Sequence, residues 1–83
     1  MATKAYVLIE VGVGKSKMVV EALRQVEGVK SADGVTGPYD IVAIVDAESS
    51  DIVGNIITED IHSVPGVSRT VTFTPSVLPP LAI

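Results

Sequence analysis

The stretch IVAIV, residues 41–45, decides the fold because it is apolar at every position and rich in β-branched side chains. A short run of this kind is typical of a strand, and its unbroken hydrophobicity predicts a strand that is buried on both faces. A second run, AYVLIEV at residues 5–11, has a similar β-branched and aromatic content. We therefore expect these two segments to form the two central strands of one sheet.

The chain repeats one structural unit around these two strands. YVLIEV (6–11) aligns with IVAIVD (41–46), and VEGVKSADGVTG (26–37) aligns with VPGVSRTVTFTP (64–75). Each half is predicted to contain a strand, a helix and a second strand.

Hydrophobic residues at helical spacing mark the two helices. The first helix is expected to begin at Ser16, a good N-cap residue, and to end before Gly28. The second is expected to follow the polar segment 46–51 and to end at Pro65-Gly66. The more polar outer strands are placed at 29–35 and 67–74.

Two interlocked halves of this kind predict an α+β fold, the ferredoxin-like βαββαβ sandwich. It has a four-stranded antiparallel sheet with two helices on one face. Hydrophobic residues make up 47% of the chain, more than one small core needs, so the uncovered face of the sheet is expected to pack against a second copy. We therefore predict a homodimer, a dimeric α/β barrel.

Composition and charge exclude several classes of function and of binding site. The 83 residues fit one domain, and the net charge of −4 with scattered basic residues argues against direct nucleic-acid binding. There are no cysteines, so disulfides and thiolate metal sites are excluded. Apolar runs are short and no signal peptide is evident, so a cytoplasmic protein without a membrane span is expected.

The stretch VGVGKSK, residues 11–17, is similar to the end of a phosphate-binding loop. That loop needs Gly-x-x-x-x-Gly-Lys-Ser/Thr, and its first glycine would fall at Ile9, inside a strand. We therefore interpret Gly12 and Gly14 as a strand-to-helix turn, with Lys15 and Lys17 in solvent.

Other polar residues offer little sign of catalysis. His62, the single histidine, is interpreted as a residue at a helix C-terminus, and no partner for a catalytic or metal-binding role is evident. Ser68, Thr70, Thr72 and Thr74 place hydroxyls on one face of the last strand, where they either pack or bind a small polar ligand. In the turn Gly37-Pro38-Tyr39-Asp40, the Asp40 carboxylate either caps backbone amides or receives a ligand's ammonium group.

Two motifs carry a resemblance to a known family. VTGPYDIVAIV (35–45) followed by VPGVSRTVTFT (64–74) resembles the effector-binding domain of the Lrp/AsnC transcription regulators, called the RAM domain. The resemblance covers roughly residues 3–75, so we take 1–83 as one RAM-like domain with 76–83 as a C-terminal tail.

The resemblance implies a non-enzymatic sensor that binds an amino acid or a related metabolite between dimers, without a cofactor or a metal. It also implies assembly of dimers into octamer or decamer rings. The ligand-binding residues it implies are Gly37, Tyr39, Asp40, Thr70 and Thr72. In this arrangement Asp40 and the backbone of the turn would contact the ammonium group of the ligand. Thr70 or Thr72 would contact the polar end of the ligand.

The sequence departs from the family pattern in three ways. No segment corresponds to the helix-turn-helix of full-length members, so we expect a stand-alone form that acts through DNA-binding relatives. Pro38 stands where the family often has a charge. The tail PSVLPPLAI is unusually apolar and is expected to dock on a neighbouring subunit. A small monooxygenase- or isomerase-like barrel enzyme and a scaffold without a ligand are the alternatives.

Overall fold

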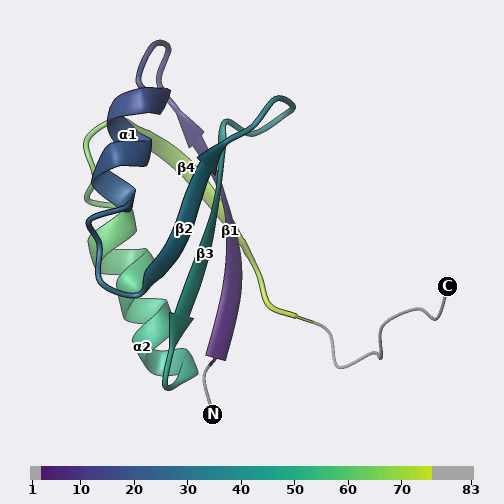
Figure 1. The fold of residues 1–83 in the computed structure, drawn as a ribbon, viewed down its shortest axis with the longest axis vertical. Helices are drawn as coiled ribbons and strands as arrows, with labels where there is room; N and C mark the ends of the chain where they lie inside the picture. The colour runs from purple at the N-terminus through teal and green to yellow at the C-terminus, as the bar shows by residue number, and fades with distance from the viewer. Residues whose placement is uncertain (1–2, 76–83) are drawn as a thin grey trace, which may run out of the picture.

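A computed structural model of the chain describes residues 3–75. It contains four strands, two helices and a helical turn in the predicted order (Figure 1), namely β1 (Thr3–Val11), α1 (Ser16–Leu23), β2 (Val29–Gly34), β3 (Ile41–Ala47), α2 (Ser50–Asn55), the π-helical turn η1 (Ile56–Ile61) and β4 (Val67–Phe73). The docking predicted for the tail at 76–83 lies outside the described residues.

The four strands form one antiparallel sheet in the order β2-β3-β1-β4. β1 and β3 lie at its centre, and Ile9 pairs with Ile41 while Ala5 pairs with Val45. The prediction that the two most apolar strands are central is confirmed. The α+β ferredoxin-like arrangement is confirmed with it.

Both helices cover the same face of the sheet, as Figure 1 shows. Strand side chains alternate between the two faces. Those facing the helices are buried with the inner side of α1, α2 and η1 in one core: Ala5, Val7, Ile9, Val19, Val20, Leu23, Ala32, Ile41, Ala43, Val45, Val53, Ile56 and Ile61. This core holds the fold together.

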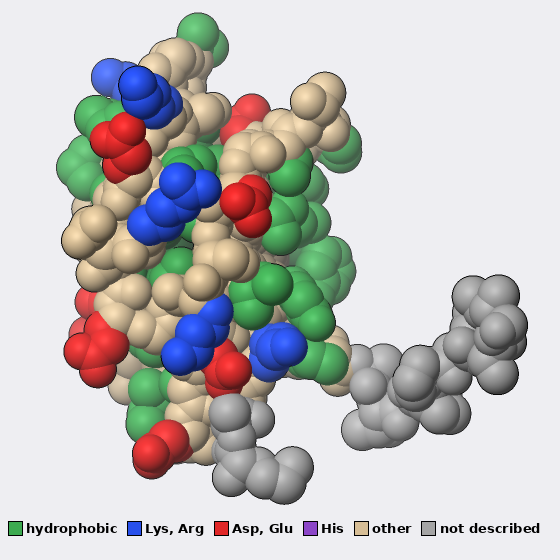
Figure 2. Space-filling model, viewed as in Figure 1, with side chains coloured by type: hydrophobic (Ala, Val, Ile, Leu, Met, Phe, Trp, Pro, Cys, Tyr) green, Lys and Arg blue, Asp and Glu red, His purple; other side chains and the backbone are tan. Residues whose placement is uncertain are grey.

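The opposite face of the sheet is apolar and has no helix over it. The register of the strands places two rows of three neighbouring residues on this face, Val42–Leu8–Val71 and Ile44–Tyr6–Phe73. We call these six residues the open face. Its aromatic residues are the most accessible, with Tyr6 37% and Phe73 52% exposed. In Figure 2, hydrophobic side chains accordingly gather along the side of the molecule that faces away from the helices.

One prediction about β3 is wrong. The strand is not buried on both faces of the single chain, because Ile41, Ala43 and Val45 are buried whereas Val42 and Ile44 are only half-buried. Its continuous hydrophobicity reflects a core on one side and an uncovered surface on the other.

The beginning of α1 also differs from expectation. Lys15, not Ser16, occupies the N-cap position, and it makes no capping bond through its side chain. The Lys15 amide donates to the Gly12 carbonyl, and this turn makes Ser16 the first helical residue. Helix α1 ends at Leu23, earlier than the predicted end just before Gly28.

The second helix begins as expected but changes its winding. Ser49 Oγ accepts a hydrogen bond from the Ile52 amide at 3.2 Å and caps α2. After Asn55 the helix continues as η1, which keeps Ile56 and Ile61 in the core. The predicted apolar stripe is therefore correct, although its spacing does not distinguish a π-helical turn from an α-helix.

Candidate functional site

The segment between β2 and β3 forms an exposed turn at one end of the sheet. The Val35 amide donates to the Asp40 carbonyl at 2.9 Å and closes the turn. Gly37 has a positive φ of 150°, a conformation that favours glycine, and a Cβ added there would meet no atom within 4 Å. Gly37 and Pro38 are exposed and Tyr39 is half-buried. The backbone of this turn is therefore accessible to a ligand.

Asp40 anchors this turn to the end of β1. Its backbone amide donates to the Ile9 carbonyl at 3.0 Å, and its Oδ2 accepts from the Val11 amide at 2.9 Å. The carboxylate thus caps a strand amide, not the turn amides considered from the sequence. In the described part of the chain, Oδ2 is the carboxylate oxygen of Asp40 that makes this hydrogen bond.

The threonines of β4 lie on the other side of β1 from the turn. Thr70 pairs with Ile9 and Thr72 with Val7, so both hydroxyls are on the helix-bearing side of the sheet. Thr70 Oγ1 lies 2.6 Å from His62 Nε2. Asp40 and Thr70 are separated by two strand spacings, roughly 10 Å. The structure does not bring the turn and the two threonines into one site within a single chain.

His62 lies at the end of η1, as its position in the sequence predicts, and its side chain is exposed. Its ring contacts the hydroxyl of Thr70 at the edge of the sheet. Within residues 3–75, no group of three or more His, Asp or Glu side chains is arranged to hold a metal ion. None of the helices in this part of the chain is long and apolar enough to cross a membrane.

Two charged residues near the turn are missed by sequence reasoning. Glu10 and Arg69 are directly opposite each other on β1 and β4, on the same face as the open face. The β1–β4 register shifts immediately after Glu10, so Val11 pairs with Val67 and Ser68 is the extra residue of a bulge. Strand alternation is the signal that could have found them, because it places Glu10 on the face of Tyr6 and Leu8 and Arg69 on the face of Val71 and Phe73.

The glycine-rich segment is a turn, as predicted. Gly14 has a φ of 76°, and Val13, Lys15 and Lys17 are exposed. Ile9 is fully buried in β1, where a phosphate-binding loop would need its first glycine.

Comparison with known proteins places this geometry in a family. The model of the Lrp/AsnC ligand binding domain matches residues 4–75. The crystal structure of TTHA0845 from Thermus thermophilus is similar, with 32% identity and a TM-score of 0.86, and the match covers 95% of this chain and 99% of that one. No curated protein matches the sequence.

Two larger regulators share the fold. E. coli AsnC is 18% identical with a TM-score of 0.83, and the match covers 98% of this chain and 54% of AsnC. The transcriptional regulator NMB0573 from Neisseria meningitidis, solved in complex with L-Met, is 13% identical with a TM-score of 0.79, covering 89% of this chain and 49% of that one. The family match over nearly the whole of the sheet and both helices is decisive: this chain belongs to the Lrp/AsnC ligand-binding domain family.

Proposed function

We propose that this chain is a cytoplasmic, non-enzymatic regulatory module that binds an amino acid or a related small metabolite. The ligand binds at contacts between homodimers, and the dimers assemble into octamer or decamer rings. The module modulates transcription by associating with DNA-binding relatives, because its own charge is −4 and its basic residues are scattered.

The observation that carries this proposal is the anchored turn at 35–40. Asp40 is fixed by two hydrogen bonds to β1, while the exposed backbone around Gly37 stays free to donate and accept. A fixed carboxylate beside free backbone groups is suited to an ammonium group next to a polar or carboxylate end. The L-Met complex of NMB0573, which shares this fold, supports an amino acid as the ligand class.

The separation of the turn from Thr70 and Thr72 supports a site built from more than one copy. Asp40 lies beyond one side of β1 and the threonines beyond the other. A ligand that meets both sets of residues therefore needs the turn of one chain and β4 of another. The open face supplies the contact that forms the dimer, and dimers then meet at the turns.

The alternative of a small barrel enzyme has less support. Enzymes of that kind place histidine or aromatic side chains in a cavity, whereas His62 is exposed at the sheet edge and bound to Thr70. Thermal unfolding in the presence of amino acids distinguishes the two functions. An enzyme that binds no amino acid would keep the same unfolding midpoint when amino acids are added.

Thermal unfolding against each of the twenty amino acids tests the proposal. A ligand that binds only the folded protein raises the midpoint, by an amount that grows with its concentration. We expect at least one amino acid at millimolar concentration to do so. If all twenty leave the midpoint unchanged, the amino-acid sensor is contradicted, and the scaffold and the enzyme are the readings that remain.

A further inference from the structure

Three charged residues stand in one row across the sheet, at the end that carries the turn. Glu10 on β1 is directly opposite Arg69 on β4. On the other side of Glu10, the Asp40 amide donates to the Ile9 carbonyl at 3.0 Å, and Asp40 Oδ2 accepts from the Val11 amide at 2.9 Å. Asp40 thus bonds to both chain neighbours of Glu10 and lies beside it. We call Asp40, Glu10 and Arg69 the charged row.

The charged row borders the open face. Strand alternation places Glu10 on the same face as Leu8, and Arg69 on the same face as Val71. Arg69 is exposed, whereas Glu10 and Asp40 are half-buried. When a second copy packs on the open face, the row lies at the rim of that contact, where a small molecule can reach it.

The charges of the row are not balanced by ion pairs. Within residues 3–75, the ion pair that forms joins Arg24, just after α1, to Asp33 on β2. Arg69 has no such partner in this part of the chain, although Glu10 is opposite it. Two carboxylates side by side repel each other, at a cost in stability. The row is therefore suited to take up a cation beside its carboxylates and an anion beside its guanidinium group.

A free α-amino acid carries both of these charges. Its ammonium group donates up to three hydrogen bonds, which two carboxylates can accept, and its carboxylate matches two parallel N–H groups of an arginine. Adjacent strands lie ~4.8 Å apart, so the Cα atoms of Asp40 and Arg69 are roughly 10 Å apart. This separation leaves room above Glu10 for the charged end of an amino acid. An amine or a carboxylic acid alone would leave part of the row unpaired.

We propose that Glu10 and Arg69 bind the charged end of the amino acid, with Arg69 on its α-carboxylate and Glu10, beside Asp40, on its α-ammonium group. The inference rests on the proposed function and names two residues that select a zwitterion. Thr70 and Thr72 of a neighbouring copy are then left to contact the side chain of the amino acid. When that copy covers the row, water is excluded and both charge-assisted hydrogen bonds become stronger.

NMR titration with each of the twenty amino acids and its α-carboxamide tests this assignment. A carboxamide keeps the ammonium group and the side chain but loses the negative charge. At about pH 6 the amino groups of both probes are protonated. We expect the parent chain to bind an amino acid at least about tenfold more tightly than its carboxamide. Equal binding of the two probes by the parent chain contradicts the role of Arg69.

Substitutions at the two residues should change the two dissociation constants differently. Arg69→Met should weaken binding of the amino acid about tenfold or more and leave the carboxamide within about twofold, because the carboxamide makes no ion pair with Arg69. Glu10→Gln should weaken both probes to a similar extent, because both carry the ammonium group. If Arg69→Met weakens both probes equally, Arg69 acts through assembly or stability and the inference is overturned. An unchanged amino-acid constant in either variant also overturns it.

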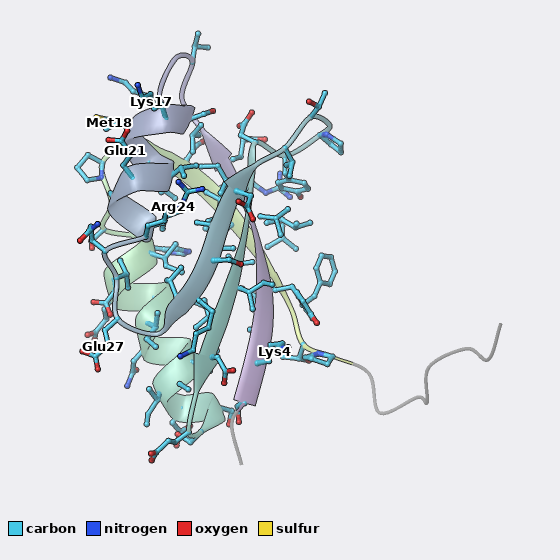
Figure 3. All side chains as sticks on the ribbon, viewed as in Figure 1. Lys4, Lys17, Met18, Glu21, Arg24 and Glu27 are labelled. Carbon is cyan, nitrogen blue, oxygen red and sulfur yellow. The ribbon has the colours of Figure 1, made fainter. Side chains whose placement is uncertain are left out.

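Lys4→Met is the matched control. Lys4 is an exposed cation on the same strand and the same face as Glu10, near the start of β1 in Figure 3, at the far end of the sheet from the turn. The control should leave both constants within about twofold. A loss as large as that of Arg69→Met would show an effect of overall charge and overturn the inference.

The outcomes separate this inference from the proposed function. If the parent chain binds none of the twenty amino acids, the proposed function is contradicted. If the parent chain binds one of them and Arg69→Met binds it equally well, only the assignment of the charged row fails. Light scattering during gel filtration checks that each variant keeps the assembly of the parent.

Discussion

At the residue scale, Asp40 has one role that the structure shows and one role in ligand binding that we propose. Its Oδ2 and its backbone amide fix the turn to β1, while the charge of the carboxylate is what an ammonium group would recognise. The two tasks can be separated by substitution, because an asparagine keeps an acceptor oxygen and loses the charge.

We expect Asp40→Asn to abolish the thermal shift produced by the effector with little effect on the stability of the free protein. Asp40→Ala should in addition lower the free energy of unfolding by about 1–2 kcal/mol, because the Val11 amide loses its acceptor. Urea unfolding with and without the effector measures both effects. Asp33→Asn, on the exposed edge strand, is the control and should retain the shift; a full shift in Asp40→Asn would remove Asp40 from the site.

The sequence identifies some of these residues and not others, for a physical reason. Glycine and proline fix the turn locally, so the place of Gly37 and Asp40 follows from the sequence. The direction of Thr70 and Thr72 depends on how β4 pairs with β1, which only the assembled sheet decides. This pairing places Thr70 and Thr72 on the helix-bearing side of the sheet. It places Glu10 opposite Arg69 on the other side.

At the scale of elements, strands are easier to read from this sequence than helix ends. Two apolar strands and two polar ones fix the order of the sheet, because burial decides which strands are central. The end of α1, the missing cap at Ser16 and the π-helical winding of η1 depend on tertiary contacts. Gly28 illustrates this, because it lies close against Ile56 of η1 and marks where the two halves of the chain meet.

Two glycine substitutions test this contact between elements. Gly28 has a φ of 96°, and a Cβ added there would lie 2.5 Å from Ile56 Cδ1. Gly28→Ala should therefore destabilise the protein by about 1–3 kcal/mol. Gly54, inside α2, has no atom within 4 Å of an added Cβ. Gly54→Ala should stabilise by about 0.5–1 kcal/mol.

Urea midpoints of the two variants measure the difference. Equal midpoints, or a Gly28→Ala protein as stable as the parent, would show that the contact with Ile56 is not tight in solution.

At the scale of the whole molecule, the feature with the largest consequence for function is the side of the sheet that neither helix covers. One face is closed by two helices, whereas the other presents six apolar residues to solvent in a chain that is 47% hydrophobic. Exposed patches of this kind mark interaction surfaces. The sequence predicts the existence of this face, whereas its six residues are identified only by the register of β1 with β3 and β4.

A charge placed on the open face should disrupt self-association without unfolding the chain. Val71 lies in the middle of that face, opposite Leu8, and is only half-buried. Val71→Lys is expected to give a folded monomer, because desolvating the ammonium group in the interface is costly. Val13→Lys, at an exposed loop tip, should leave the assembly intact. Circular dichroism confirms folding, and a Val71→Lys protein that remains assembled places the contact elsewhere.

The molar mass of the unmodified chain in solution, measured by light scattering during gel filtration, tests the central claim most directly. The account predicts a mass of roughly 17 kDa, twice the 8.6 kDa of one chain, or a whole multiple of that pair. A single species of 8.6 kDa would contradict it, because the open face would then be stable in water without a partner.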